Sequence, residues 1–453
     1  MFRYLRQVYQ RHRKKLVIAT GVAAFSYLIS IYVRHKLKDF QEQLKEENAT
    51  RELIKKRFTQ TQKDCYMTFL SFLPVLIEPI YKELDVEQIT KELKLIRKNK
   101  NTSLDDKSEL SSSDITSSSN LNRIKERMGE GQTKSNARKN KVELWQDLKH
   151  KSITRFLTII YSETLLIILL HLQLNIISRK SYLKTALKLA SNNQGIKLID
   201  LEKNMDSPEM DIDDTDEDLP EQAFLSFTWW LLNKGSMELK SIITESVEST
   251  FSGVSLRQEL SIEEFDNLIL QVQKDVDSRI LEGSCLTEGG ERFGLENLLL
   301  PSPEDEFTLL QNTNTVKFIS SFNANVSNAQ ILQKMNSELK GYLRGSQVAQ
   351  LVRVISSLGI SNILDRVHDG LLHKNVSTYD AKGVSDLQES ADERNKDTPK
   401  REDSWKLALI LATLTPQTKE LTNRHVDNSI LYTMNNVSGL DDLSASVYSN
   451  FDL

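Results

Sequence analysis

The chain has 453 residues, with 59 lysines and arginines against 63 aspartates and glutamates, giving a formal net charge of −4. This balance argues against a strongly basic nucleic-acid binder, and no domain-wide basic stripe with interleaved aromatic residues is present. Only 16 glycines and 8 prolines occur, and apolar residues recur at helical spacing, so we expect an all-α protein.

The first predicted element is an uncharged apolar run from Leu16 to Val33. As a helix, it is about 27 Å long, close to the thickness of the bilayer core. We therefore predict a transmembrane anchor at 16–33, preceded by a short basic segment at 1–15. A cleaved signal peptide and a buried soluble helix are the alternatives. The basic residues nearest the run on its N-terminal side are Arg11, Arg13, Lys14 and Lys15.

The orientation of this anchor is ambiguous from the residues alone. More basic residues precede the run than closely follow it, and the positive-inside rule would then leave the N-terminus in the cytosol. The only two cysteines, Cys65 and Cys285, are far apart and suggest no disulfide framework. That pattern instead favours a reducing compartment for residues 34–453.

Beyond the anchor, residues 34–60 are charged on nearly every turn and predict a helical stalk. The apolar stretch that follows contains Pro74 and Pro79, which we expect to kink or break its helix. A short amphipathic helix then begins after Asp85, with Gln88 at the reciprocal capping position.

Residues 139–191 carry a long helical pattern whose centre, 156–177, is apolar enough to be a second membrane span. Glu163 lies within this stretch and would cost roughly 2.5 to 3.5 kcal/mol or more in lipid. We therefore favour the central buried helix of a bundle. His171 in the same stretch is expected to be a hydrogen-bonded interior histidine.

The remaining chain alternates helical patterns with polar stretches. Ser261 and Glu264 form a capping box that opens a further amphipathic helix. The expected architecture is an elongated helical bundle in a cytosolic domain at 34–453, with one N-terminal transmembrane helix. Long disordered loops are predicted at 99–138, 192–221 and 374–402, where the composition is too polar to form a core.

No catalytic constellation stands out. The segment DIDDT at 211–215 matches the aspartyl-phosphate pattern of dehalogenase-type phosphatases, but it lies in an acidic loop and not after a buried strand. The histidines are scattered without metal-ligand spacing. We expect no enzyme activity, no metal site and no cofactor.

Trp145 is the most suggestive single residue. It lies four residues after Lys141 and four before Lys149, which predicts an indole framed by lysines on one helix face. Such an exposed, rigid aromatic suits the binding of an amphipathic helix with acidic edges. The alternative is a tryptophan packed under the loop at 99–138. The pair Trp229 and Trp230 is taken as structural.

Several blocks carry a resemblance to a known family. They are CYMTFLSFLP, KVELWQDLKHKSITRF, LHLQLNIISRKSYL, QAFLSFTWWLLNKG and LDDLSASVYSNF, in this order along the chain. Together with the short basic segment before a single anchor, they resemble the peroxin-3 family in its budding-yeast form.

This resemblance implies a peroxisomal membrane protein with a luminal N-terminus and a cytosolic helical domain. In that family the domain binds an amphipathic helix of peroxin-19, the cytosolic receptor and chaperone for peroxisomal membrane proteins. Trp145 and Lys141 match the family's binding positions, and Leu93 and Ile96 are alternatives for its groove leucine. Insertion of cargo into the membrane would then need no nucleotide chemistry here.

The resemblance further implies contacts with membrane lipids, an inheritance factor and a pexophagy receptor. The sequence leaves open whether the anchor first inserts in the endoplasmic reticulum. A different class of function also stays open: a structural organelle tether without receptor docking, in which Trp145 is merely buried.

Overall fold

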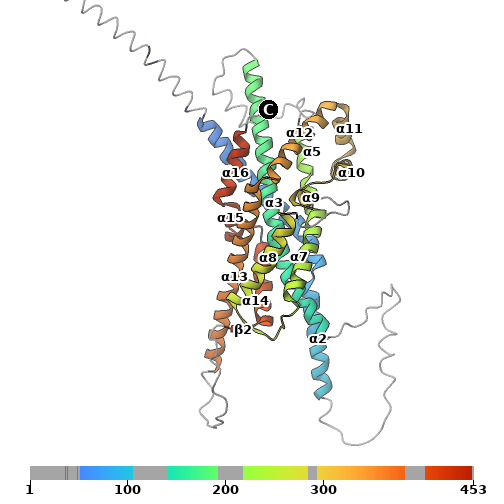
Figure 1. Cartoon of the computed structure of the whole chain (residues 1–453), viewed down its shortest axis with the longest axis vertical. Coiled ribbons are helices and arrows are strands. Elements are labelled where there is room, and N and C mark those ends of the chain that lie inside the picture. The colour runs from blue at the N-terminus through green and yellow to red at the C-terminus, as the bar shows by residue number, and fades with distance from the viewer. Residues whose placement is uncertain are drawn as a thin grey trace, which may run out of the picture. The chain divides into compact units, whose positions relative to one another are not determined.

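The computed structural model is almost entirely helical (Figure 1). It describes residues 51–105, 141–191, 218–283, 293–382 and 404–450, and three single residues, Lys36, Lys38 and Asn48. The predicted anchor at 16–33, its basic flank and the DIDDT segment lie outside the described residues.

The chain divides into two compact units. One comprises residues 1–62 and 178–210, and the other comprises residues 63–177 and 211–453. In the smaller unit, the hydroxyls of Thr61 and Ser178 are hydrogen-bonded at 2.8 Å. The features described below belong to the larger unit, except that the longest helix continues past residue 177 into the smaller one.

The first helix of the larger unit continues to residue 83 and passes through both Pro74 and Pro79. The helix is therefore not broken at either proline. Each proline removes one backbone donor, but the neighbouring side chains of Leu73, Leu76 and Ile80 are fully buried. Burying one such side chain contributes about 1.5 to 3 kcal/mol, which offsets the lost hydrogen bonds.

Helix α2 (Val86–Asp105) begins at the predicted cap. The Asp85 carboxylate accepts a hydrogen bond of 2.8 Å from the backbone N–H of Gln88. The Gln88 side chain donates to Glu92 instead of returning to the cap. The helix extends through residues 99–105, so the first part of the loop predicted at 99–138 is helical instead.

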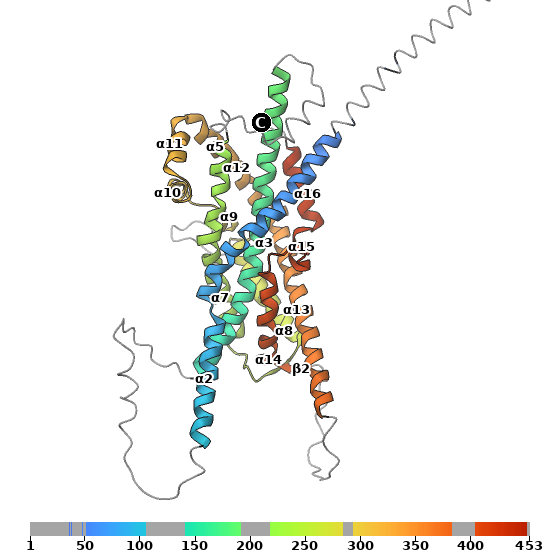
Figure 2. The ribbon, with the colours of Figure 1, turned by 180° about the vertical axis from the view of Figure 1, so that it is seen from behind.

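Helix α3 (Lys141–Ser191) contains the apolar centre of the fold. Among the described residues, its segment Val142–Lys184 is the one stretch long and apolar enough to cross a membrane, and its most apolar window is completely buried by protein. In both views α3 passes among the other helices of the larger unit (Figures 1 and 2). The prediction of a buried bundle helix at 156–177 is thus confirmed.

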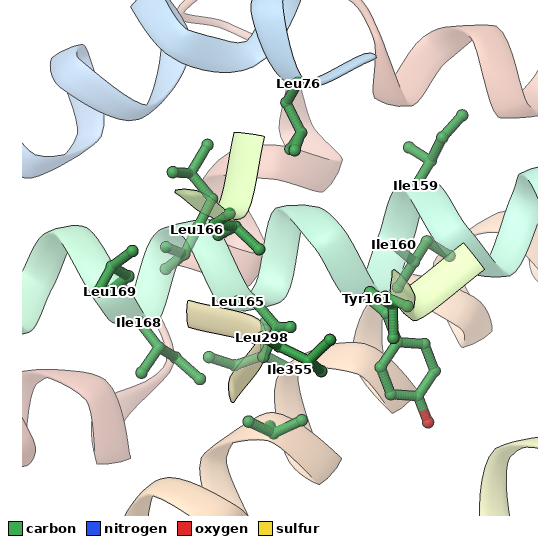
Figure 3. Close-up of a cluster of buried hydrophobic side chains, with 14 of the residues drawn as sticks. Leu76, Ile159, Ile160, Tyr161, Leu165, Leu166, Ile168, Leu169, Leu298 and Ile355 are labelled. Atoms are coloured by element: carbon green, nitrogen blue, oxygen red, sulfur yellow. The ribbon is translucent and has the colours of Figure 1, made fainter. Parts of the chain in front are cut away.

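Side chains of α3 pack against several other elements. Figure 3 shows Leu165 and Leu166 of α3 in one cluster with Leu76, Leu298 and Ile355 from other helices.

His171 adds a polar link, because its ring nitrogens lie 3.0 Å from the Ser444 hydroxyl and 3.1 Å from Asn435 Oδ1. Burial lowers the pKa of His171 to about 4. The predicted interior histidine is confirmed.

The C-terminal two thirds of the larger unit are mostly short and medium helices. They are α5 (Leu219–Ser226), α6 (Thr228–Trp230), the π-helical turn η1 (Leu231–Gly235), α7 (Ser236–Phe251), α8 (Ile262–Ile280), α9 (Leu295–Leu299), α10 (Pro303–Thr313), α11 (Val316–Ala324), α12 (Val326–Leu343), α13 (Ser346–Lys382), α14 (Leu407–Leu421), α15 (Ser429–Asn435) and α16 (Ser438–Ser449). The capping box of Ser261 and Glu264 at the start of α8 is present as predicted.

A small sheet departs from the purely helical expectation. Strand β1 (Glu259–Ser261) pairs antiparallel with β2 (Ser404–Lys406), and Leu260 lies opposite Trp405. Three residues per strand are too few to change the fold class, which is all-α as predicted.

The tryptophan pair is structural as expected. Trp229 and Trp230 are partly buried against the main core. The Trp230 indole donates to the Asn297 carbonyl at 3.0 Å, and the Lys234 ammonium lies 4.6 Å from the centre of its ring.

Candidate docking site

Two antiparallel helices form a small apolar cluster apart from the main core. Ile89 and Leu93 of α2 are buried against Leu144 of α3, and Leu148 packs on them. We call these four residues the α2–α3 cluster. Glu87 at the start of α2 contacts Arg155, whereas the later residues Ile89 and Leu93 pack with residues nearer the start of α3, so the two helices run in opposite directions.

Exposed apolar side chains adjoin this cluster. Trp145, next to Leu144 on α3, keeps 36% of its surface exposed, and Val142, one turn earlier, keeps 63%. On α2, Leu95 and Ile96 are 59% and 38% exposed. A contiguous exposed apolar patch is typical of an interaction site, and these four side chains lie on the two helices that form the cluster. Trp145 is thus only partly covered by the described residues, and most of the loop at 99–138, under which it could alternatively pack, lies outside them.

The two candidate leucine positions have different environments. Leu93 is only 7% exposed and contributes to the α2–α3 cluster, whereas Ile96 lies on the surface. Lys141 is the first residue of α3, one helical turn before Trp145. The structure therefore brings Trp145, Leu93 and Ile96 to the same pair of helices, with Lys141 at the start of one of them.

Lys149 does not frame Trp145 on the surface, contrary to expectation. It is fully buried, and its ammonium donates to the carbonyls of Phe251 at 2.6 Å and Val254 at 2.9 Å. These carbonyls lie at the C-terminal end of α7 and just beyond it, where helices leave acceptors unpaired. Desolvation lowers the pKa of Lys149.

An ion pair between a buried arginine and a half-exposed glutamate lies at the base of α2. Arg155 of α3 is 1% exposed, and its Nη1 and Nη2 atoms donate to the two carboxylate oxygens of Glu87 at 2.6 and 3.3 Å. Partial burial acts to raise the pKa of Glu87, but the hydrogen bonds and charge of Arg155 outweigh it and lower the pKa. The Lys419 ammonium lies 3.5 Å from the same carboxylate.

Sequence reasoning missed both members of this pair. One signal was available, because Arg155 directly precedes the apolar stretch at 156–177 and an arginine so placed needs a partner. Its identity could not be read from the sequence, since Glu87 lies 68 residues away.

A hollow of about 1120 Å³ lies elsewhere in the larger unit, lined in part by Trp230, Phe293 and Arg344. None of the predicted site residues lines it. Its charges are largely paired with one another, since Glu296 accepts from Arg344 at 2.9 Å and lies 3.5 Å from Lys340. The hollow therefore indicates no particular ligand.

Comparison with known proteins gives consistent matches along the chain. A family model described as Peroxin-3 matches residues 7–450. The peroxisomal membrane protein PEX3 of Komagataella phaffii is 43% identical over 471 residues, with 100% of both chains covered. The peroxisomal biogenesis factor 3 of Saccharomyces cerevisiae is 28% identical over 481 residues, covering 98% of this chain and 96% of that protein.

A mammalian relative is more distant. The peroxisomal biogenesis factor 3 of Bos taurus is 24% identical over 367 residues, covering 81% of this chain and 79% of that protein. The match of the family model and the full-length similarity to the yeast relative lead to the same conclusion. The chain belongs to the peroxin-3 family.

Proposed function

We propose that this protein is a peroxisomal membrane-anchored docking factor that binds peroxin-19 and serves the insertion of peroxisomal membrane proteins. The family and the names of its relatives support a role in peroxisome biogenesis. The observation that carries the docking role is the partly exposed Trp145 beside the α2–α3 cluster.

In this proposal an amphipathic helix of peroxin-19 lies across α2 and the start of α3. Its apolar face contacts Trp145 and the exposed Ile96. A tryptophan held on a rigid helix offers a large contact area at a low cost in conformational entropy, which is why such residues dominate many interfaces. Leu93 and the rest of the cluster support this surface from below.

Charge complementarity would add specificity. Lys91 and Lys94 of α2 are exposed next to Leu93, and Lys141 begins α3. Acidic residues at the edges of the partner helix would be attracted to these lysines. Such surface charges chiefly raise the rate of association and are screened by salt.

The membrane side of the proposal rests on the sequence. Residues 16–33 span the peroxisomal membrane, residues 1–15 are luminal, and residues 34–453 face the cytosol. The basic residues Arg11, Arg13, Lys14 and Lys15 act as a targeting segment. Peroxin-19 would deliver cargo to this anchored domain, and further surfaces would serve an inheritance factor and a pexophagy receptor.

Titration calorimetry tests the docking role against the alternative of a structural tether. Full-length wild type and Trp145→Ala, both in nanodiscs, would be titrated with the N-terminal helix of peroxin-19. We expect the variant to lose more than about 1 kcal/mol of binding free energy, as is usual for an interface hot spot, and to melt like wild type. A folded wild type that does not bind would favour the tether.

A further inference from the structure

We propose that Arg155 and Glu87 are positioning residues for the docking surface: their ion pair sets the direction of α2 against α3 and so the spacing of Trp145 from Ile96. The expected effect on binding rests on the proposed docking function. The effect on the position of α2 can be tested without any partner.

The contact is unusually well restrained for a side-chain pair. Both arms of the Arg155 guanidinium reach the Glu87 carboxylate, at 2.6 and 3.3 Å. Paired hydrogen bonds between two planar groups fix orientation as well as distance. The guanidinium also lies 4.6 Å from the centre of the Tyr81 ring, and its Nη1 atom is 3.5 Å from the Leu84 carbonyl.

These contacts bracket a junction in the chain. The first helix ends at residue 83 and α2 starts at Val86, so Leu84 and Asp85 form the link between them. Arg155 contacts Tyr81 in the first helix, Leu84 in the link and Glu87 in α2. One side chain of α3 therefore holds both sides of the point at which α2 could change direction.

Farther along, apolar packing of α2 on α3 consists of the α2–α3 cluster, which is separate from the main core. Apolar burial favours contact but is not directional. Ile96 lies nine residues beyond Glu87, about 13.5 Å along the helix. A rotation of about 10° at the base would therefore move Ile96 by roughly 2 Å, given that length. Such a shift is large for an interface that needs close shape complementarity.

The pair also offers a way to separate positioning from stability. Removing Glu87 alone would leave the buried Arg155 charge without its carboxylate partner, which is strongly destabilising. Replacing both by uncharged side chains of similar volume is often neutral for stability. The double variant Arg155→Met/Glu87→Gln is therefore suited to the test. Lys419, the other neighbour of Glu87, is 56% exposed and can be solvated by water.

The experiment measures the α2–α3 distance in spin-labelled protein and the affinity in unlabelled protein, both full-length and in nanodiscs. Spin labels are placed at Lys94→Cys on α2 and Gln146→Cys on α3, both exposed positions. Cys65 is buried and its thiol pKa is raised far above the ordinary range, so it does not compete for the label. Cys285 is replaced by serine.

We expect the double variant to broaden the distribution of distances between the two labels. We also expect it to weaken binding of the peroxin-19 helix by about tenfold or more, while the melting temperature stays within a few degrees. A matched control removes the pair of Arg279 and Glu245, 2.8 Å apart on α8 and α7, with Arg279→Met/Glu245→Gln. This control should change neither the distances nor the affinity.

An unchanged distance distribution in the double variant would overturn the inference. Broadened distances with wild-type affinity would equally overturn it, because docking would then not depend on the position of α2. Should wild type itself not bind the peptide, the proposed function fails, and the distances alone decide the geometric part.

Arg155→Lys provides a second variant if the double variant does not fold. Lysine keeps the charge but cannot form the paired hydrogen bonds. The inference predicts that Arg155→Lys broadens the distribution of label distances. A distribution identical to that of wild type would contradict the inference.

Discussion

Trp145 and Lys149 lie one turn apart on α3 and have opposite environments: the indole is 36% exposed, and the lysine is fully buried with its ammonium 2.6 Å from the Phe251 carbonyl. The buried lysine joins the start of α3 to the end of α7. Residues four apart share a helix face, so the contrast arises from what covers each turn: the end of α7 covers Lys149 and leaves Trp145 partly exposed.

Replacing Lys149 should therefore affect stability more than its charge alone would suggest. We expect Lys149→Met to lower the free energy of unfolding by about 1 to 3 kcal/mol, since the carbonyls of Phe251 and Val254 lose their donor while partly shielded from water. Urea denaturation of the full-length protein measures this change. Lys151→Met is the control, because Lys151 is only partly buried, and a loss equal to that of Lys149→Met would contradict the account.

Glu163 gives a pH-dependent prediction. Its carboxyl is fully buried in α3, neither oxygen has a hydrogen-bond partner, and burial raises its pKa well above the model-compound value of 4.5. The folded protein therefore holds a proton that the unfolded chain releases above pH 4.5. Below that pH both the folded and the unfolded chain hold the proton, and the contribution of Glu163 to the free energy of unfolding is at its most favourable. As the pH rises from there toward the folded pKa, the free energy of unfolding falls by about 1.4 kcal/mol per pH unit.

Glu163→Gln removes this titration and keeps the shape of the side chain. We expect the variant to be more stable than wild type at neutral pH, with a difference that shrinks toward pH 4.5. Parallel denaturation series between pH 4.5 and 8 measure it. A difference that does not vary with pH would show that Glu163 is not protonated in the folded state.

Two glycines make a matched pair for packing. A Cβ atom added at Gly235, the last residue of η1, would lie 1.9 Å from the Leu298 carbonyl oxygen, whereas one added at Gly341 in α12 meets nothing within 4 Å. Gly235→Ala should therefore destabilise the fold by about 1 to 3 kcal/mol or more through overpacking. Gly341→Ala should stabilise it by about 0.5 to 1 kcal/mol through helix propensity. Thermal unfolding of both variants is the measurement, and equal effects would contradict the close approach of η1 and α9.

Features encoded by local pattern were predictable from the sequence. The capping box at Ser261 and the buried centre of α3 follow from residue spacing and from the cost of placing Glu163 in lipid. The expectation that two lysines frame Trp145 on the surface is wrong for Lys149, although Trp145 itself is partly exposed. Which face of α3 meets α7 depends on tertiary packing, and spacing along one helix does not determine it.

Features set by distant partners were not predictable. The helix around Pro74 and Pro79 continues because its side chains are buried by other segments. Glu87 and Arg155 are 68 residues apart, and β1 pairs with a strand that starts at residue 404. None of these contacts leaves a periodic signal in the sequence, since each depends on where separate helices end and pack.

The central claim is that the partner helix contacts the surface around Trp145. Site-specific photocrosslinking in the full-length protein tests it directly. A benzoylphenylalanine placed at Val142, 63% exposed and one turn before Trp145, should crosslink to peroxin-19. The same group at Val316, 84% exposed on α11, should not. Crosslinks from position 316 but not from position 142 would contradict the account.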